Sequence, residues 1–121
     1  MLLDSNIIIY ATQPAFSAIR EFLLENQTSV SAISVVEVLG YHKLTQVENE
    51  QFQQFFDNVQ IYPVTETIIK KATRLRQLRK MSLGDAIIAA TCLVHQLTLV
   101  THNVTDFDWI DGLQLIDPIK A

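Results

Sequence analysis

The chain has 121 residues, 49% hydrophobic and 18% charged, and its 9 basic and 13 acidic residues give a formal net charge of −4. This length indicates one folded domain over residues 1–121, and the composition is too apolar for a disordered chain. The one cysteine, Cys92, excludes an intrachain disulfide and a thiolate zinc site, and it fits a reducing compartment. The acidic balance also argues against a nucleic-acid partner, because phosphate-binding proteins are usually basic.

The start of the chain and one apolar window bear on its location. Met1-Leu2-Leu3-Asp4 lacks the basic start of a secretory signal and reaches a carboxylate at once. Residues 86–105 carry no charge, but polar side chains interrupt them, whereas a membrane span needs about 20 predominantly apolar residues. A buried helix followed by a buried strand explains this window better, so we expect a cytoplasmic protein with no membrane partner.

Short apolar runs of strand length alternate with segments of helical periodicity along the chain. The predicted strands are 1–3, 29–33, 59–62, 97–100 and 113–116. The predicted helices are 15–25, 34–44, 48–57, 65–80 and 82–95. This alternation, with strands that lack polar alternation, predicts an α/β sandwich around a mainly parallel sheet of about five strands.

Carboxylates follow three of the predicted strands, where a parallel sheet has its ligand-binding edge. Asp4 follows the first strand, Glu37 comes four residues after the second in a predicted first helical turn, and Asp106 comes shortly after the fourth. Asp85 begins the predicted buried helix 82–95. Since the ends of parallel strands point the same way, the four acids could converge on one pocket.

Converging carboxylates repel one another unless a cation joins them. An oxygen-only cluster selects a hard ion such as Mg²⁺ or Mn²⁺, and the three histidines show no zinc-type spacing. Two such ions about 3.5–4 Å apart can clamp the attacking and leaving oxygens of a phosphodiester displacement. A metal-bound water would be the nucleophile, because the chain has no G-x-S-x-G elbow and no Cys–His pairing with local support.

Most of these acids also have a structural interpretation. Ser34-Val-Val-Glu37 and Ser82-Leu-Gly-Asp85 match a capping box, and a carboxylate in a first helical turn complements the helix dipole. Taken singly, these two acids are better explained as caps, and Asp106 could belong to a plain turn or cap. Asp4 resists this explanation, because strands disfavour Asp.

Four segments that carry the acids form an ordered set of motifs across almost the whole chain. They are Leu3-Asp4-Ser5-Asn6-Ile7-Ile8, Ile33-Ser34-Val35-Val36-Glu37-Val38, Leu83-Gly84-Asp85-Ala86-Ile87-Ile88-Ala89-Ala90 and Leu99-Val100-Thr101-His102-Asn103-Val104-Thr105-Asp106-Phe107. Together they resemble the PIN-domain family, in particular the small ribonuclease toxins of bacterial VapBC toxin–antitoxin pairs. Any one motif alone is weak, whereas all four in family order are specific.

The resemblance implies a PIN-like three-layer α/β/α sandwich that cleaves RNA with Mg²⁺ or Mn²⁺, one or two ions per site. It also implies a cognate antitoxin and a homodimer. The implied catalytic and metal-binding acids are Asp4, Glu37, Asp85 and Asp106, with Asn6, Thr101 and Asn103 supporting the site through hydrogen bonds.

Two positions depart from the family pattern. Ser5 stands where Thr is common, which keeps the hydroxyl. His102 stands where a basic Arg is common, and His is mostly neutral at pH 7, so we expect a solvent-facing loop residue rather than a phosphate contact.

Six of the nine basic residues lie between positions 70 and 80. They are Lys70, Lys71, Arg74, Arg76, Arg79 and Lys80. A phosphate-steering surface and a solvated helix face explain them about equally well, and the approach to Asp85 favours RNA binding by the first four. Arg79 falls over the apolar face, so the helix should end or bend there. Trp109 could rim the pocket or anchor a dimer.

Three functions compete. The first is a metal-dependent endoribonuclease, the toxin of a VapBC-type pair. The alternative is a catalytically inactive PIN-like module that binds RNA or protein, which the presence of all four acids disfavours. The third is a phosphohydrolase with Asp4 as nucleophile, although such enzymes usually carry Asp where Asn6 stands.

The acidic net charge takes on another meaning under the first hypothesis. Without the four acids the chain has nine acidic and nine basic residues, so the surplus is the site itself. Two divalent ions would cancel it. The net charge therefore no longer argues against RNA.

Overall fold

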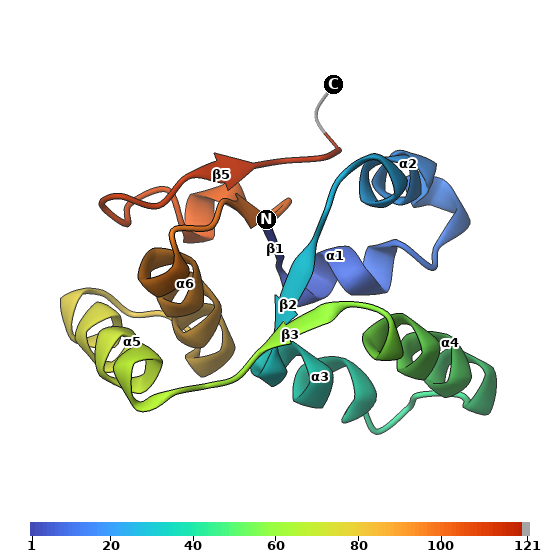
Figure 1. Ribbon diagram of the computed structural model, residues 1–121, viewed down its shortest axis with the longest axis horizontal. Helices are drawn as coiled ribbons and strands as arrows, with labels where there is room; N and C mark the ends of the chain where they lie inside the picture. Colours follow the sequence, from blue (N-terminus) through green and yellow to red (C-terminus); the bar gives the residue numbers. More distant parts are fainter. Residues whose placement is uncertain (120–121) are drawn as a thin grey trace.

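A five-stranded, entirely parallel sheet forms the centre of the computed structural model, which describes residues 1–119 (Figure 1). The strand order is β3-β2-β1-β4-β5. The strands are β1 (Leu2–Leu3), β2 (Ser29–Ser31), β3 (Gln60–Tyr62), β4 (Leu99–Val100) and β5 (Leu115–Ile116). In register, Leu2 lies opposite both Ser29 and Leu99. The predicted parallel sheet is confirmed, with strands up to two residues shorter than their apolar runs.

Six α-helices cover the sheet (Figure 1). They are α1 (Ser5–Tyr10), α2 (Ser17–Glu25), α3 (Ala32–Leu39), α4 (Gln46–Asp57), α5 (Glu66–Leu78) and α6 (Leu83–His95). Helices α5 and α6 pack on one face, and α1, α2 and α4 lie on the other with most of α3, so the three-layer sandwich is confirmed. Among residues 1–119, no helix is long and apolar enough to cross a bilayer.

Two cores sit on the two faces of the sheet. Leu2 and Leu99 point into the core formed with α5 and α6, whereas Leu3, Val30 and Val100 point into the core formed with the other helices. Successive strand residues face opposite sides, and here both sides are covered. This burial explains why the strands show no polar alternation.

The structure differs from the predicted elements at two places near the site. Helix α1 was not predicted, because its Ile7-Ile8-Ile9 run favours a strand; burial of Ile7 and Ile8 in the core outweighs that propensity. Helix α3 begins at Ala32, with the Ser31 hydroxyl accepting the Ile33 N–H at 3.2 Å. Glu37 therefore lies in the second turn, and both its predicted first-turn position and its capping box are wrong.

Candidate active site

Asp4 is the buried centre of the candidate site, with 3% of its surface exposed. Its backbone N–H donates to the Val100 carbonyl at 2.9 Å, and its own carbonyl accepts the Ile7 N–H at 3.0 Å. These bonds fix it between β1 and α1. The Thr101 hydroxyl donates to Asp4 Oδ2 at 2.8 Å and itself accepts the Asn103 N–H at 3.0 Å. The end of β4 thus orients the carboxylate that follows β1.

Glu37 reaches the site from α3 through a chain of hydroxyls. Ser5 Oγ lies 2.8 Å from Glu37 Oε1 and 2.8 Å from Ser34 Oγ. Because a hydroxyl has one proton, Ser5 satisfies both contacts by donating to the carboxylate and accepting from Ser34. Both serines are buried, whereas Glu37 as a whole is exposed. One carboxylate oxygen of Glu37, Oε1, is therefore held by a buried serine, although the residue as a whole is exposed.

Gly84 gives the Glu37 carboxylate its space. A Cβ atom at Gly84 would lie 2.8 Å from Glu37 Cδ and 2.9 Å from Oε1, and closer still to Oε2. Contacts this short force something to move. The Glu37 carboxylate can therefore occupy its position beside Asp85 because residue 84 has no side chain.

Asp85 and Asp106 complete the group of acids. Ser82 caps α6, and its hydroxyl accepts the Asp85 N–H at 3.1 Å, which is one of the two hydrogen bonds of the predicted capping box. The Asp85 side chain is half-buried. Asp106 lies exposed in a short 3₁₀ helix (Val104–Asp106) after β4. The cap and the site are compatible, because the cap uses the backbone of Asp85.

The four acids form one electrostatic cluster. Burial raises the pKa of Asp4 from 3.8 to about 6; the Thr101 hydrogen bond opposes this rise, and the Asp85 and Glu37 charges add to it. Burial also raises the pKa of Asp85, with the Ser82 side chain opposing and the Asp106 and Glu37 charges adding. Each carboxylate is thus close enough to at least one other for their charges to repel, as the spacing along the chain suggested.

A cavity of about 510 Å³ opens beside Asp85 and Asp106, and basic side chains also line it. Its lining includes Arg76, Arg79, Lys80, Thr105 and Trp109. The Arg79 guanidinium lies over the Trp109 ring, with Cζ 5.4 Å from the ring centroid. The cavity therefore brings two carboxylates and three cationic side chains together, a charge pattern suited to a phosphodiester bond next to a bound cation.

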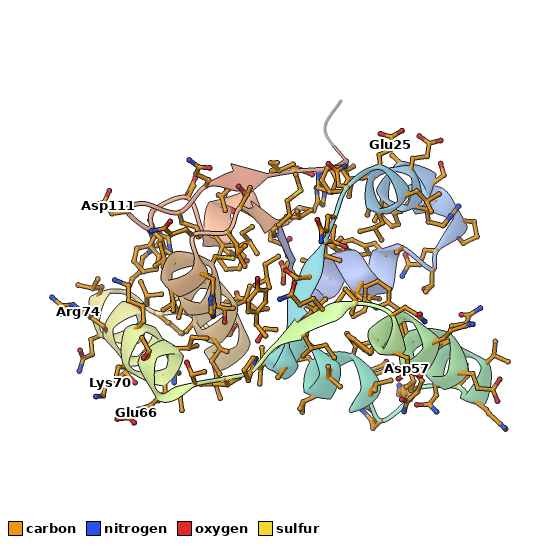
Figure 2. All side chains as sticks on the ribbon, in the orientation of Figure 1. Glu25, Asp57, Glu66, Lys70, Arg74 and Asp111 are labelled. Atoms are coloured by element: carbon orange, nitrogen blue, oxygen red, sulfur yellow. The ribbon has the colours of Figure 1, made fainter. Side chains whose placement is uncertain are left out.

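The predicted RNA-binding residues divide between two places. Arg76 lines the acidic cavity, whereas Lys70, Lys71 and Arg74 line a separate depression with Thr67 and Val94. Lys70 and Arg74 point outward from α5 in Figure 2, and Lys70 pairs with Glu66 at 3.2 Å.

Sequence reasoning did not assign Arg79 and Lys80 to the RNA surface, although both line the acidic cavity. The feature that could have placed them there is the end of the helix, which is predicted at Arg79. The structure confirms it, because Arg79 is the C-cap of α5. A chain that leaves its helix at this residue turns back toward Ser82 and Asp85.

The supporting residues act in different ways. Thr101 contributes its hydroxyl, and Asn103 contributes its backbone N–H. Asn6 is exposed, while its neighbour Ser5 makes the buried contact. His102 is exposed, as predicted, and its Nδ1 lies 3.1 Å from Asp117 Oδ2. The roles of Ser5 and Gly84 depend on helix packing, which sequence spacing alone does not indicate.

The cluster fits a hard divalent cation by its chemistry. All its donors are carboxylate oxygens, and their mutual repulsion is what a cation relieves. Within residues 1–119, no three His, Cys, Asp or Glu side chains are already close enough to hold one ion together.

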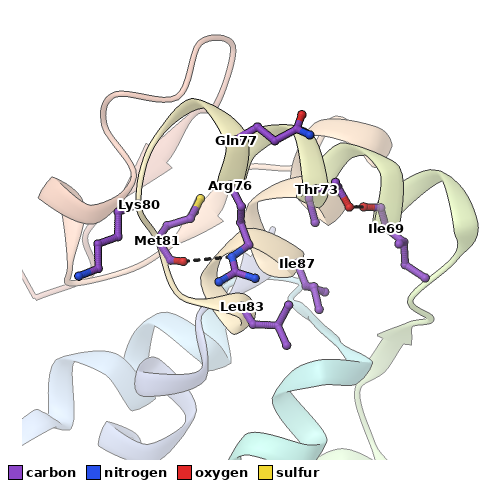
Figure 3. A pocket seen from close by; sticks show the side chains of 9 residues that line it. Ile69, Thr73, Arg76, Gln77, Lys80, Met81, Leu83 and Ile87 are labelled. Atoms are coloured by element: carbon purple, nitrogen blue, oxygen red, sulfur yellow. Dashed lines mark hydrogen bonds between the residues drawn. The ribbon is translucent and has the colours of Figure 1, made fainter.

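A second cavity, of about 570 Å³, adjoins the first on the outer side of α5 and α6 (Figure 3). Its lining is mainly apolar and includes Ile69, Leu83 and Ile87, and it shares Arg76, Lys80 and Met81 with the acidic cavity. Arg76 Nε donates to the Met81 carbonyl at 3.3 Å. This bond holds the Arg76 side chain between the two cavities. The second cavity lacks a carboxylate among its lining residues, so it adds no acid to the site.

Comparisons with known proteins agree with this architecture. A family model described as PIN domain matches residues 1–113. Ribonuclease VapC10 of Mycobacterium tuberculosis is 27% identical over 123 residues, which cover 94% of this chain and 90% of that protein. A toxin–antitoxin complex from Klebsiella pneumoniae contains a chain with 29% identity and a TM-score of 0.83, covering 99% of this chain and 98% of that one. VapBC-1 from nontypeable Haemophilus influenzae gives 25% identity, a TM-score of 0.81 and 98% coverage of both chains.

Proposed function

Because the chain belongs to the PIN domain family, we propose that it is a metal-dependent endoribonuclease, the toxin of a VapBC-type toxin–antitoxin pair. One observation carries the proposal: four carboxylates from four segments interact electrostatically, and two of them, Asp85 and Asp106, line a cavity that basic side chains also line. The names of the similar proteins support the same activity.

Asp4, Glu37, Asp85 and Asp106 would hold Mg²⁺ or Mn²⁺. Bound there, the ion would supply Lewis acidity toward the phosphate and a lowered pKa for water. Hydrogen bonds from Thr101 to Asp4 and from Ser5 to Glu37 orient these two acids before a metal binds. Arg76 and Lys80 receive the phosphates that flank the bond to be cut.

Cleavage of RNA by the purified chain, freed of any antitoxin, tests the proposal. We expect cleavage with Mg²⁺ or Mn²⁺ that EDTA abolishes. Asp85→Asn keeps the shape of the side chain, so it should remove cleavage and leave the fold intact. Asp57→Asn is the matched control, because Asp57 is an exposed acid at the end of α4 (Figure 2). Intact activity in Asp85→Asn, or no cleavage by the native chain, would contradict the proposal.

We further propose that an antitoxin protein holds this chain and that the chain forms a homodimer, as the complexes of similar chains suggest. Exposed apolar side chains that such partners could cover are present on four helices, α2, α3, α4 and α5. They are Leu24, Val36, Val47 and Ile69, with relative exposures of 88%, 65%, 64% and 52%. Co-expression with the neighbouring short reading frame should yield a stable complex without ribonuclease activity.

A further inference from the structure

We propose that Arg79 and Trp109 form a stacking pair that binds one base of the RNA, next to the phosphate at the acidic cluster. The inference rests on the proposed ribonuclease function and adds to it a subsite for a base. It starts from the position of Trp109, which lines the same cavity as Asp85 and Asp106.

The indole ring is fixed against one of the site acids. Trp109 Nε1 donates to the Asp106 carbonyl at 3.0 Å, and part of the ring packs against the core below α6. Its N–H is already used, and the Arg79 guanidinium lies over the ring, so a base would stack on the outer surface of this pair and not between its members. Stacking on a ring face suits every base, whereas a free N–H would favour particular acceptors.

Arg79 adds a second flat surface. It is exposed at the C-cap of α5, and its guanidinium lies over the Trp109 ring at 5.4 Å. Bases of single-stranded RNA stack on aromatic rings and on guanidinium planes alike. Arg76 and Lys80 flank the pair and can neutralise the adjoining phosphates. The pair therefore has the composition of a site for single-stranded nucleic acid.

The size of the cavity agrees with a base as its occupant. Its volume of about 510 Å³ lies within the ~300–1,000 Å³ typical of small-ligand pockets. A nucleotide bound there would have its base on the stacking pair and its phosphate toward Asp85 and Asp106. Trp109 would then position the nucleotide next to the cleaved bond, whichever base that nucleotide carries.

The chain offers a direct probe, because Trp109 is its one tryptophan. Its fluorescence can be followed while the full chain, in EDTA so that RNA stays intact, is titrated with a short single-stranded RNA. A second titration uses an abasic oligonucleotide of the same length, and free tryptophan serves as the blank. We expect saturable quenching by the RNA and little quenching by the abasic oligonucleotide.

Variants separate stacking from charge, with affinity measured on labelled oligonucleotides. Trp109→Ala should weaken RNA binding about tenfold and leave abasic binding nearly unchanged, whereas Trp109→Phe should retain most of the affinity. Arg79→Ala should weaken binding of the RNA more than that of the abasic oligonucleotide. Arg74→Ala, which removes the same charge from the outer side of α5, should show no such difference.

The outcomes distinguish the two proposals. If the chain binds and cuts RNA while Trp109 fluorescence stays constant, the stacking pair is overturned and the ribonuclease stands. Equal losses for RNA and abasic oligonucleotides in Trp109→Ala and Arg79→Ala would also overturn it. If the chain neither binds nor cuts RNA under any condition, the proposed function fails and the subsite fails with it.

Discussion

Asp4 shows how one buried side chain links the stability of the protein to pH. Its pKa is raised to about 6, so in the folded chain it binds a proton more tightly than in the unfolded chain. The stabilisation from this group is complete below pH 4 and is lost as the pH rises through about 6. Asp85, whose pKa is also raised, acts in the same direction.

Asp4→Asn tests this linkage. Asn is nearly isosteric, can still accept the Thr101 hydrogen bond, and has no charge to bury. In EDTA at pH 7 the variant should be more stable than the native chain, by up to about 3 kcal/mol. Urea unfolding at pH 4.5 and at pH 7, values chosen on either side of the raised pKa, measures the effect. A gain of equal size at both values would contradict it, and Asp57→Asn controls for loss of net charge.

Gly84 is important because it has no Cβ atom. Gly84→Ala should displace the Glu37 carboxylate and lower cleavage by roughly 10²-fold, since small misplacements at a reacting centre have effects of that order. Stability should change little, because alanine favours a helix and offsets part of the clash.

A second substitution makes the Gly84 prediction specific. Glu37→Asp shortens the acid, so it should reduce activity less in the Gly84→Ala background than in the native chain. Rates of single-turnover RNA cleavage for the four proteins of this cycle measure the coupling. Additive losses would mean that the two residues do not act through their contact.

At the scale of elements, α5 carries cations on two sides that face different surroundings. Arg76 faces the acidic cavity and Lys80 lies just after the helix, whereas Lys70 and Arg74 lie on the outer side. Both pairs contribute the same charge to the whole molecule. Their different positions therefore allow local contact to be separated from general attraction of RNA.

Two double variants with matched charge make the comparison. Arg76→Glu with Lys80→Glu should weaken RNA binding and reduce the slope of log affinity against log salt by up to about 1.4, as expected for two lost phosphate contacts on a single strand. Lys70→Glu with Arg74→Glu should change the slope less. Measuring RNA affinity over a range of salt concentrations distinguishes the two cases. Equal slopes of log affinity against log salt for the two double variants would mean that RNA contacts both sides of α5.

The elements also show where sequence reasoning succeeds. Helix α5 has 3.6-residue periodicity, α6 is apolar on nearly all sides, and both have polar caps, so their extents are predicted to within about two residues. Helix α1 consists of six residues with three isoleucines, and only its burial makes it a helix. The start of α3 depends on whether Ser31 or Ser34 caps it, and local sequence permits either.

At the scale of the whole molecule, the parallel sheet explains why the meeting of Asp4 with Thr101 was predictable, whereas the roles of Ser5 and Gly84 were not. Asp4 and Thr101 follow neighbouring parallel strands, so their meeting follows from topology alone. The contact between Glu37 and Gly84 depends on how two helices pack across the sheet edge. The burial that raises the pKa of Asp4 likewise depends on every layer being in place.

Divalent ions should therefore stabilise the whole fold. We expect Mg²⁺ or Mn²⁺ to raise the melting temperature at pH 7, by an amount that corresponds to about 2.7 kcal/mol when the ion is at 100 times its dissociation constant. The shift should be smaller at pH 5, because protons compete for Asp4 below its raised pKa of about 6. Thermal unfolding with the ion and with EDTA measures this effect. If the ion raised the melting temperature of Asp85→Asn by the same amount, it would bind at a site other than the acidic cluster.

The space at Gly84 has a practical consequence. A chain that cleaves RNA harms the cell that makes it, and we expect removal of a site acid to abolish its activity. Side chains of increasing size at position 84 would instead move the Glu37 carboxylate by increasing amounts while all four acids remain. Such a series would give graded activity from one scaffold, and growth of the producing cells would rank its members before any protein is purified.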